Sequence, residues 1–226
     1  MRYEIFGENL PAVTLYLDKN ESVYTQSSGM TWMSADIKME TNMKGGLLKG
    51  IGRMLSGDSL FMVTYSGTGS GQSITFSSSF PGNIVTLDAS KGPYICQKSA
   101  FLCAESSVTL GTYVLPGLKA GLFGGDGFIL QEVSGKGTMF LEIDGSVKEI
   151  DLAAGEKLKI QTGNVAAYEK RVKYSVEMVK GFSNILFGGE GLFLTTIEGP
   201  GKVWLQTMTL PTFASKIIPF VPTKSD

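Results

Sequence analysis

The amino-acid sequence predicts an all-β protein made of three copies of one β-meander. Short segments rich in Val, Ile, Thr, Tyr and Phe alternate apolar and polar residues along the chain, which is typical of strands with one buried face. The 29 glycines stand between these segments, as a fold with many tight turns requires. A phrase of glycine, acid and apolar residues also occurs three times, beginning at Gly57, Gly125 and Gly189. Together these patterns favour a single domain over residues 1–226.

The period of this phrase predicts the size of the copies. The three phrases begin 68 and then 64 residues apart, and each is followed ten residues later by Gly-x-Gly, at 67–69, 135–137 and 199–201. Such a period is typical of one supersecondary unit stacked on its own copies, because one unit cannot bury its apolar face alone. The predicted copies span about 1–80, 81–144 and 145–210, and a carboxy-terminal tail follows at 211–226.

Strands and turns can be placed within the copies. The clearest alternating patterns lie at 13–17, 74–76, 147–150 and 174–178. Equivalent second strands are expected at 31–35, 101–105 and 165–169. Asp144-Gly145, between two apolar segments, predicts a β-hairpin with a primed turn.

One segment departs from the β pattern and predicts a short helix at 47–55. Its apolar residues fall at helical spacing: Leu47, Leu48, Ile51, Met54 and Leu55. Each glycine within or beside it costs about 1 kcal/mol relative to alanine in a helix. The apolar stripe could lie on a membrane surface or a partner, or it could plug an open end of the β-structure. The weak helix and the few cations beside it favour the plug.

Composition limits the possible functions. The chain has no histidine, which excludes Ser-His-Asp and Cys-His catalysis and every His-ligated metal site. We therefore expect no enzyme and no cofactor. The formal charge is -1 and only 18% of residues are charged, so no nucleic-acid partner is expected. Residues 1–6 read as a strand and no apolar run is long enough to cross a membrane, so a cytoplasmic location is expected.

Three carboxylates occupy equivalent places in the repeated phrase: Asp58, Asp126 and Glu190. If they converged on an axis, their oxygens could bind a hard cation. Equivalence does not require convergence, and an acid in a turn before a strand ordinarily accepts local backbone hydrogen bonds. We therefore favour the turn role and expect no metal. The neighbouring Gly57, Gly125 and Gly189 are expected to be structural turn residues.

The two cysteines, Cys96 and Cys103, flank a hairpin turn predicted at Lys98-Ser99. In that hairpin the two thiols would be offset, and cytoplasmic thiols stay reduced, so no disulfide is expected. Cys103 aligns with Met33 and Ala167 of the other copies, which indicates a small buried apolar residue.

The tail is apolar and contains Ile217, Ile218 and Phe220. Its two prolines restrict it to an edge strand or an extended run. Left in water, this apolar surface would cost about 25 cal/mol per Å². It either folds back on its own subunit or docks on a neighbour. Together with the 47–55 stripe it forms the candidate interaction surface.

The triplicate phrase resembles the family of altered inheritance of mitochondria protein twenty-four. So does the opening from Tyr3-Glu4-Ile5 to Gly29-Met30-Thr31-Trp32-Met33, and the resemblance runs from about Tyr3 to Pro211. It implies a TRAP-like fold, similar to a sandwich or double-stranded β-helix, and a homotrimer. Eukaryotic relatives are associated with mitochondrial inner-membrane organisation, whereas bacterial members are generally uncharacterised. This sequence shows no transit peptide, so the mitochondrial role is not expected of it. The family implies no catalytic residues.

These observations predict a non-catalytic, self-associating scaffold or interaction protein. A trimer is favoured, with a peripheral membrane or protein partner suggested by the resemblance. The alternative is a small-molecule or nucleic-acid binding module, as the TRAP-like resemblance implies. The near-zero charge argues against nucleic acid, whereas a polar pocket at a subunit junction would favour a small ligand. An enzyme that uses carboxylates is a third possibility, which the missing histidine disfavours.

Overall fold

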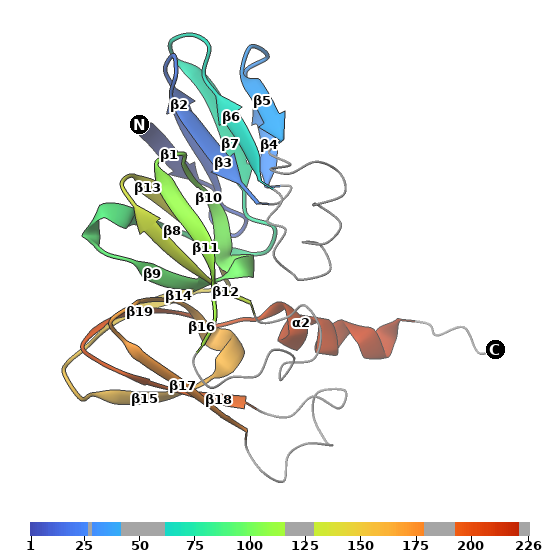
Figure 1. Ribbon diagram of the computed structural model, residues 1–226. Coiled ribbons are helices and arrows are strands. Elements are labelled where there is room, and N and C mark those ends of the chain that lie inside the picture. Colours follow the sequence, from blue (N-terminus) through green and yellow to red (C-terminus); the bar gives the residue numbers. More distant parts are fainter. Residues whose placement is uncertain (27–28, 42–61, 116–128, 179–192, 222–226) are drawn as a thin grey trace, which may run out of the picture.

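Strands make up most of the protein, and the predicted all-β class is confirmed (Figure 1). The computed structural model describes residues 1–26, 29–41, 62–115, 129–178 and 193–221. Within these ranges the one α-helix is α2 (Leu210–Ile217). It follows the last strand and leads to the carboxy-terminal end of the chain.

The strands fall into three successive sets. The first set, preceded by β1 (Arg2–Phe6), contains β2 (Ala12–Leu17), β3 (Ser22–Thr25), β4 (Met30–Met33), β5 (Lys38–Thr41), β6 (Val63–Ser66) and β7 (Gln72–Ser77). The second contains β8 (Gly82–Asp88), β9 (Tyr94–Gln97), β10 (Phe101–Glu105), β11 (Val108–Tyr113), β12 (Leu130–Gly135) and β13 (Thr138–Asp144). The third contains β14 (Val147–Leu152), β15 (Lys157–Gln161), β16 (Val165–Glu169), β17 (Lys173–Met178), β18 (Phe193–Glu198) and β19 (Gly201–Gln206).

The same antiparallel pairing occurs in all three sets. The sixth strand of each set lies between the first and third, so β7, β13 and β19 are central in one half. The fifth strand lies between the second and fourth, so β6, β12 and β18 are central in the other half. Each set is therefore a small sandwich of two three-stranded halves.

Two strand pairs join the sets into a row. β3 of the first set pairs with β10 of the second, and β9 of the second pairs with β16 of the third. The result is four sheets, which we number from the amino-terminal end: β1-β2-β7-β4, β5-β6-β3-β10-β13-β8, β11-β12-β9-β16-β19-β14 and β15-β18-β17. The three sets follow one another from the top to the bottom of Figure 1.

Each pair of successive sheets encloses an apolar core. Leu15 and Phe76 lie in the first core, between the first and second sheets. Met139 and Trp204 lie in the second core, between the second and third sheets. Tyr168 lies in the third core, which faces the fourth sheet. The second and third sheets each face a core on both sides, so their central strands, such as β9, β10 and β16, are buried on both faces.

Two predicted hairpins are wrong. β13 and β14, on either side of Asp144-Gly145, belong to different sheets. β9 and β10, on either side of Lys98-Ser99, also belong to different sheets and are joined by the 3₁₀ turn Lys98–Ala100. In both places the short turn carries the chain across a sandwich, because consecutive strands must cover opposite sides of a core. Gly145 does adopt the left-handed turn conformation, with φ 71°.

Several predicted features lie outside the described residues. The chain between the fourth and fifth strands of each set, at 42–61, 116–128 and 179–192, is not described. These segments contain the helix predicted at 47–55 with Leu47, Leu48, Ile51, Met54 and Leu55, the glycines Gly57, Gly125 and Gly189, and the acids Asp58, Asp126 and Glu190. Their roles stay predictions.

The tail is helical, so the predicted edge strand or extended run is wrong. Thr209 caps α2, its hydroxyl accepting a hydrogen bond from the Thr212 amide at 3.3 Å. Pro211 falls in the first turn, where a missing N–H breaks no helical hydrogen bond. The 3₁₀ turn Ile218–Phe220 follows, and Pro219 stands in its first turn for the same reason.

Candidate functional site

The outer face of the first sheet carries exposed aromatic residues. Phe6 on β1 and Trp32 on β4 lie at opposite edges of this sheet, yet their ring centroids are 6.2 Å apart. Between them, the Thr14 and Thr75 hydroxyls form a hydrogen bond of 2.8 Å on the central strands. Thr75 is fully buried, whereas Phe6 remains 41% exposed and Trp32 52% exposed. This pair of rings, which we call the aromatic cap, therefore presents apolar surface to solvent.

Trp32 stands at a position that is buried in the other two sets. It pairs with Thr75 on β7, as Cys103 pairs with Phe140 on β13 and Ala167 with Trp204 on β19. In all three strands the register shifts just before this residue, which marks the same bulge. Cys103 and Ala167 are both 0% exposed because a preceding set covers them. Trp32 is in the first set, and among the described residues no earlier set lies over it.

This comparison corrects the predicted alignment of Cys103. The strand registers show that Cys103 occupies the position equivalent to Trp32, whereas Ala104 occupies the position equivalent to Met33. The bulge explains the shift of one position. Trp32 was not among the predicted site residues; the signal in the sequence was a large aromatic residue where the other sets have cysteine and alanine.

The row of sets also ends in two open strand edges. Among the described residues, β4 pairs only with β7 and β15 pairs only with β18. Their counterparts β10 and β16, and β3 and β9, each have partners on both sides. An edge strand presents unpaired N–H and C=O groups to any further strand. Other strands also lie at sheet edges, but β4 and β15 are the edge strands whose counterparts in the neighbouring sets are paired.

The two faces of β15 differ in character. Leu158 and Ile160 pack against the third core. Lys157 and Lys159 lie on the other face, where Lys157 Nζ is 3.1 Å from Glu198 and Lys159 Nζ is 2.6 Å from Glu177. Both lysines are more than half exposed, so these ion pairs add little stability. They do neutralise the cations along this edge.

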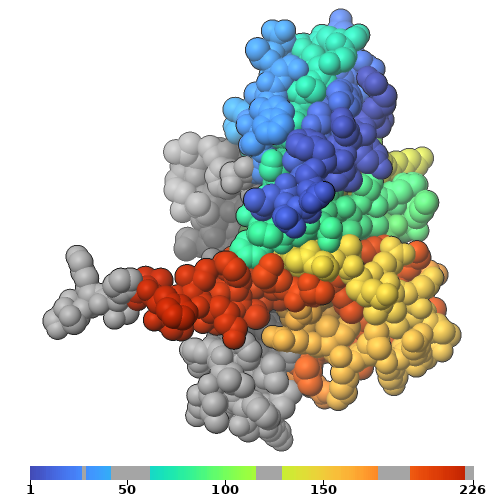
Figure 2. Space-filling model, turned by 180° about the vertical axis from the view of Figure 1, so that it is seen from behind, coloured from blue at the N-terminus to red at the C-terminus, as the bar shows by residue number. Residues whose placement is uncertain are grey.

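The tail forms a second apolar surface. In Figure 2, α2 and residues 218–221 lie across the back of the molecule as an orange-red ridge. Of the predicted tail residues, Ile217 is 45%, Ile218 65% and Phe220 85% exposed. Phe213 contacts Phe80 with ring centroids 4.9 Å apart, so one side of the helix is packed on its own subunit. Within the described ranges, no helix has the length and apolar content needed to span a bilayer.

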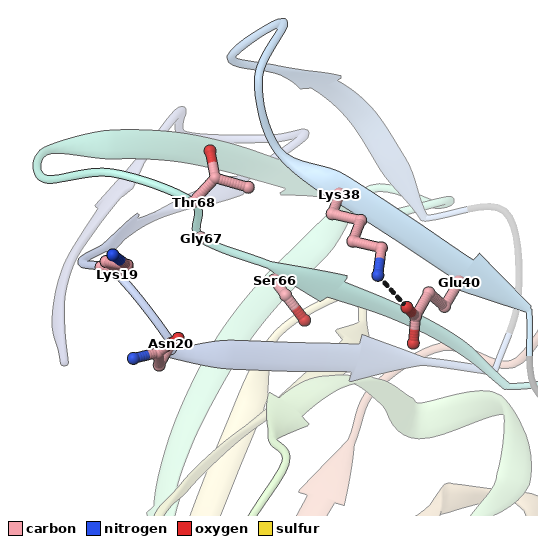
Figure 3. A pocket seen from close by; sticks show the side chains of 7 residues that line it. All are labelled: Lys19, Asn20, Lys38, Glu40, Ser66, Gly67 and Thr68. Atoms are coloured by element: carbon pink, nitrogen blue, oxygen red, sulfur yellow. Dashed lines mark ion pairs between the residues drawn. The ribbon is translucent and has the colours of Figure 1, made fainter.

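A polar hollow lies near the tip of the first set (Figure 3). Its lining residues are Lys19, Asn20, Lys38, Glu40, Ser66, Gly67 and Thr68. The Lys38 ammonium is 2.6 Å from the Glu40 carboxylate, and Figure 3 shows this ion pair on one side of the hollow. Lys38 is therefore already neutralised by Glu40. The hollow is open and mixed in charge, which gives it no clear preference for a ligand.

The two thiols are buried and in separate cores. Cys96 lies in the second core and Cys103 in the first, and both are free. Burial raises the pKa of the Cys96 thiol to about 12 and also raises that of Cys103. Both are therefore protonated and apolar at neutral pH, which agrees with the buried role predicted for Cys103.

Acidic groups do not cluster around a metal site within the described ranges. No three His, Cys, Asp or Glu side chains there form a group able to hold a metal ion. The most perturbed acid is Asp144, whose pKa is raised to about 6 by burial and by the nearby Glu142 carboxylate. Glu142 itself accepts hydrogen bonds from the Ser79 amide at 2.7 Å and the Ser79 hydroxyl at 2.8 Å. The hydrogen bonds between Glu142 and Ser79 hold the segment between β7 and β8 against β13.

Comparison with known proteins gives a consistent result along the whole chain. A family model described as Mitochondrial biogenesis AIM24 matches residues 3–208. An uncharacterised protein of Streptococcus pyogenes serotype M6 is 30% identical over 226 residues, covering 96% of this chain and 89% of that protein. The crystal structure of a Streptococcus pyogenes protein is similar with a TM-score of 0.80 at 26% identity, covering 97% of this chain and 99% of that one.

Proposed function

The chain belongs to the Mitochondrial biogenesis AIM24 family, as its resemblance predicted, and we propose that it is a scaffold protein that associates with further copies of itself. In this proposal the protein acts by binding rather than by catalysis. Its trimeric state, expected from the family resemblance, belongs to the same proposal.

The observation that carries the proposal is the exposure of Trp32. A residue 52% exposed stands where Cys103 and Ala167 are completely buried by a neighbouring set. Together with Phe6, it leaves an aromatic surface on the outer face of the first sheet. Trp and Tyr are enriched among the residues that dominate protein interfaces, because they bury much apolar area in few rotatable bonds.

The chemistry of the remaining groups supports binding over catalysis. The sequence contains no histidine, and both thiols are buried and held in the neutral form. A thiol acts as a nucleophile only as the thiolate. The open hollow of Figure 3 has one of its two lysines paired with Glu40, so it gives less support to the alternative of a small-molecule binding module.

Light scattering coupled to size exclusion tests the proposal directly. The full-length protein should elute as an oligomer at micromolar concentration, and the mass should fall on dilution. Trp32→Arg should weaken the assembly, because it places a charge in the aromatic cap. Met39→Arg is the matched control, since Met39 is 53% exposed on β5, away from the cap. A native protein that stays monomeric at every concentration would overturn the proposal.

A further inference from the structure

We propose that β15 of one copy pairs antiparallel with β4 of the next, so that copies join head to tail through the same strand pairing that joins the sets within one chain. This inference rests on the proposed self-association and identifies the surfaces that produce it. A second copy of the chain is the partner for the following reason. β15 lacks a partner equivalent to β10 or β16, and β4 of another copy is that equivalent strand.

The two junctions inside the chain share one register. At the first, Ala104 on β10 lies opposite Tyr24 on β3. At the second, Tyr168 on β16 lies opposite Ile95 on β9. These are equivalent positions. Ala104 and Tyr168 directly follow Cys103 and Ala167, which are the first paired residues after each bulge.

The equivalence of Tyr24 and Ile95 follows from their partners within each set. Tyr24 pairs with Thr64 and Ile95 with Glu132, each three residues before the first glycine of Gly-x-Gly. In the third set the same place belongs to Thr196, and its partner on β15 is Lys159. These equivalences therefore determine a single register for the pairing of β15 with β4 of another copy.

That register predicts specific residue pairs between copies. Met33 of the next copy lies opposite Lys159, as Ala104 lies opposite Tyr24. Trp32 of the next copy lies opposite Ile160, as Ala167 lies opposite Cys96. Joining the edges in this way turns the fourth sheet of one copy and the first sheet of the next into one sheet. The strand order around the new junction, β18-β15-β4-β7, repeats the orders β6-β3-β10-β13 and β12-β9-β16-β19.

The faces of the two strands agree with this junction. Residues directly opposite each other on paired strands project from the same face. Ile160 packs against the third core, so Trp32 of the next copy extends that core, as Cys103 extends the first core and Ala167 the second. The junction buries the apolar surface that Trp32 leaves exposed in the single chain.

The lysines on β15 do not prevent the pairing. Lysine on an edge strand ordinarily discourages further strands, because its charge is costly to bury. Lys159 is bound to Glu177 at 2.6 Å, and its long apolar stem can cover Met33 of the next copy while the ammonium stays in solvent. The junction is also heterologous, since each copy contributes a different edge, so it produces either a closed ring or an open filament.

Cross-linking between two different variants, each with one added cysteine, tests the register. Residues directly opposite on antiparallel strands have Cα atoms about 4.5–5.5 Å apart, which is within the range that a disulfide can bridge. Trp32→Cys mixed with Ile160→Cys should therefore give a disulfide-linked dimer on a non-reducing gel. The native thiols of Cys96 and Cys103 are 0% exposed and do not compete. Trp32→Cys mixed with Met39→Cys, on the edge strand β5, is the control and should not cross-link.

A second pair of variants keeps Trp32, because replacing Trp32 could itself weaken the association. Met33→Cys mixed with Lys159→Cys keeps the aromatic cap and probes the adjacent register position. A cross-link in both mixtures supports the proposal. If neither mixture cross-links while light scattering shows that the variants still associate, the strand pairing is wrong although the proposed function stands. If the native protein is monomeric, both are wrong.

Discussion

The rings of Phe80 and Phe213 meet edge to face, with centroids 4.9 Å apart and planes at 76°. Phe80 precedes β8, and Phe213 lies in α2, so this contact joins the tail to the segment between the first two sets. Phe213 is 39% exposed, and no residue of α2 is fully buried. The aromatic contact attaches the helix to the sheets, whereas its apolar residues Leu210 and Ile217 are exposed.

A double-mutant cycle should measure this attachment. Phe80→Ala, Phe213→Ala and the double variant should show a coupling energy of about 0.5–1.5 kcal/mol, the usual value for an aromatic pair of this geometry. Urea unfolding of the four proteins supplies the free energies. Phe220→Ala is the control: Phe220 is 85% exposed, so its loss should change stability by less than about 0.5 kcal/mol. Additive single effects at Phe80 and Phe213 would contradict the contact.

Two glycines of the Gly-x-Gly motifs are required by close backbone approach. A Cβ added at Gly67 would lie 2.4 Å from the Asp18 carbonyl oxygen, and one at Gly199 would lie 2.3 Å from that of Ala153. Each carbonyl belongs to the turn after the first strand of its set. Gly67→Ala and Gly199→Ala should each destabilise the protein by about 1–3 kcal/mol or more, because backbone must move to admit the methyl group.

Gly111→Ala is the matched control for these substitutions. Gly111 also lies in a β-region, on β11, but a Cβ there would have no atom within 4 Å. It should be neutral or slightly stabilising, since alanine restricts the unfolded chain more than glycine does. Thermal unfolding of the three variants distinguishes the cases. An unchanged melting temperature for Gly67→Ala would show that the backbone relaxes easily there.

The sequence predicted the fold class but not the strand pairing. Alternating apolar residues and punctuating glycines were sufficient to predict an all-β chain, because these patterns depend on local geometry. The turn at Asp144-Gly145 was also visible, yet its hairpin was not formed. A turn motif predicts that the chain changes direction. Which sheet the next strand joins depends on which core its apolar residues can pack against. That information is distributed over distant residues such as Phe140 and Trp204.

The candidate surface was predicted only in part. The tail residues Ile217, Ile218 and Phe220 were recognised as apolar and are exposed. Their helical conformation was missed, because the two prolines predicted an edge strand or an extended run, although proline also fits the first turn of a helix. Trp32 was missed because its exposure is meaningful only beside the buried Cys103 and Ala167, a comparison that requires the strand registers.

Both thiols should be unreactive in the folded protein. Cys96 and Cys103 are 0% exposed, and burial raises the pKa of each well above its usual range. A disulfide reagent such as Ellman's should therefore react with two thiols in denaturant and with almost none under native conditions at pH 8, since it needs an accessible thiolate. Rapid native reaction of one equivalent would mean that a core opens readily around that cysteine.

The stability of the protein should depend on pH through the Asp144 carboxyl group. Its pKa is about 6 in the folded protein and 3.8 as the ordinary value, with burial as the main cause and Glu142 as the second. Between these two values the folded chain holds a proton that the unfolded chain has lost. The contribution of Asp144 to the free energy of unfolding therefore falls as the pH rises through this window, and it levels off above it. Asp144→Asn should remove this fall and raise stability at pH 7.

Asp88→Asn provides a control of opposite sign. The hydroxyl and amide of Ser90 hydrogen-bond the Asp88 carboxylate and lower its pKa, so its contribution is present above its ordinary pKa and is lost in more acidic solution. This substitution should leave the slope between pH 4 and 6 unchanged and should not stabilise the protein at pH 7. Urea unfolding at several pH values measures both variants. If Asp144→Asn were less stable than the native protein at pH 7, the ionised carboxylate would be making favourable contacts that outweigh its burial beside Glu142, and the direction of the pKa shift would be wrong.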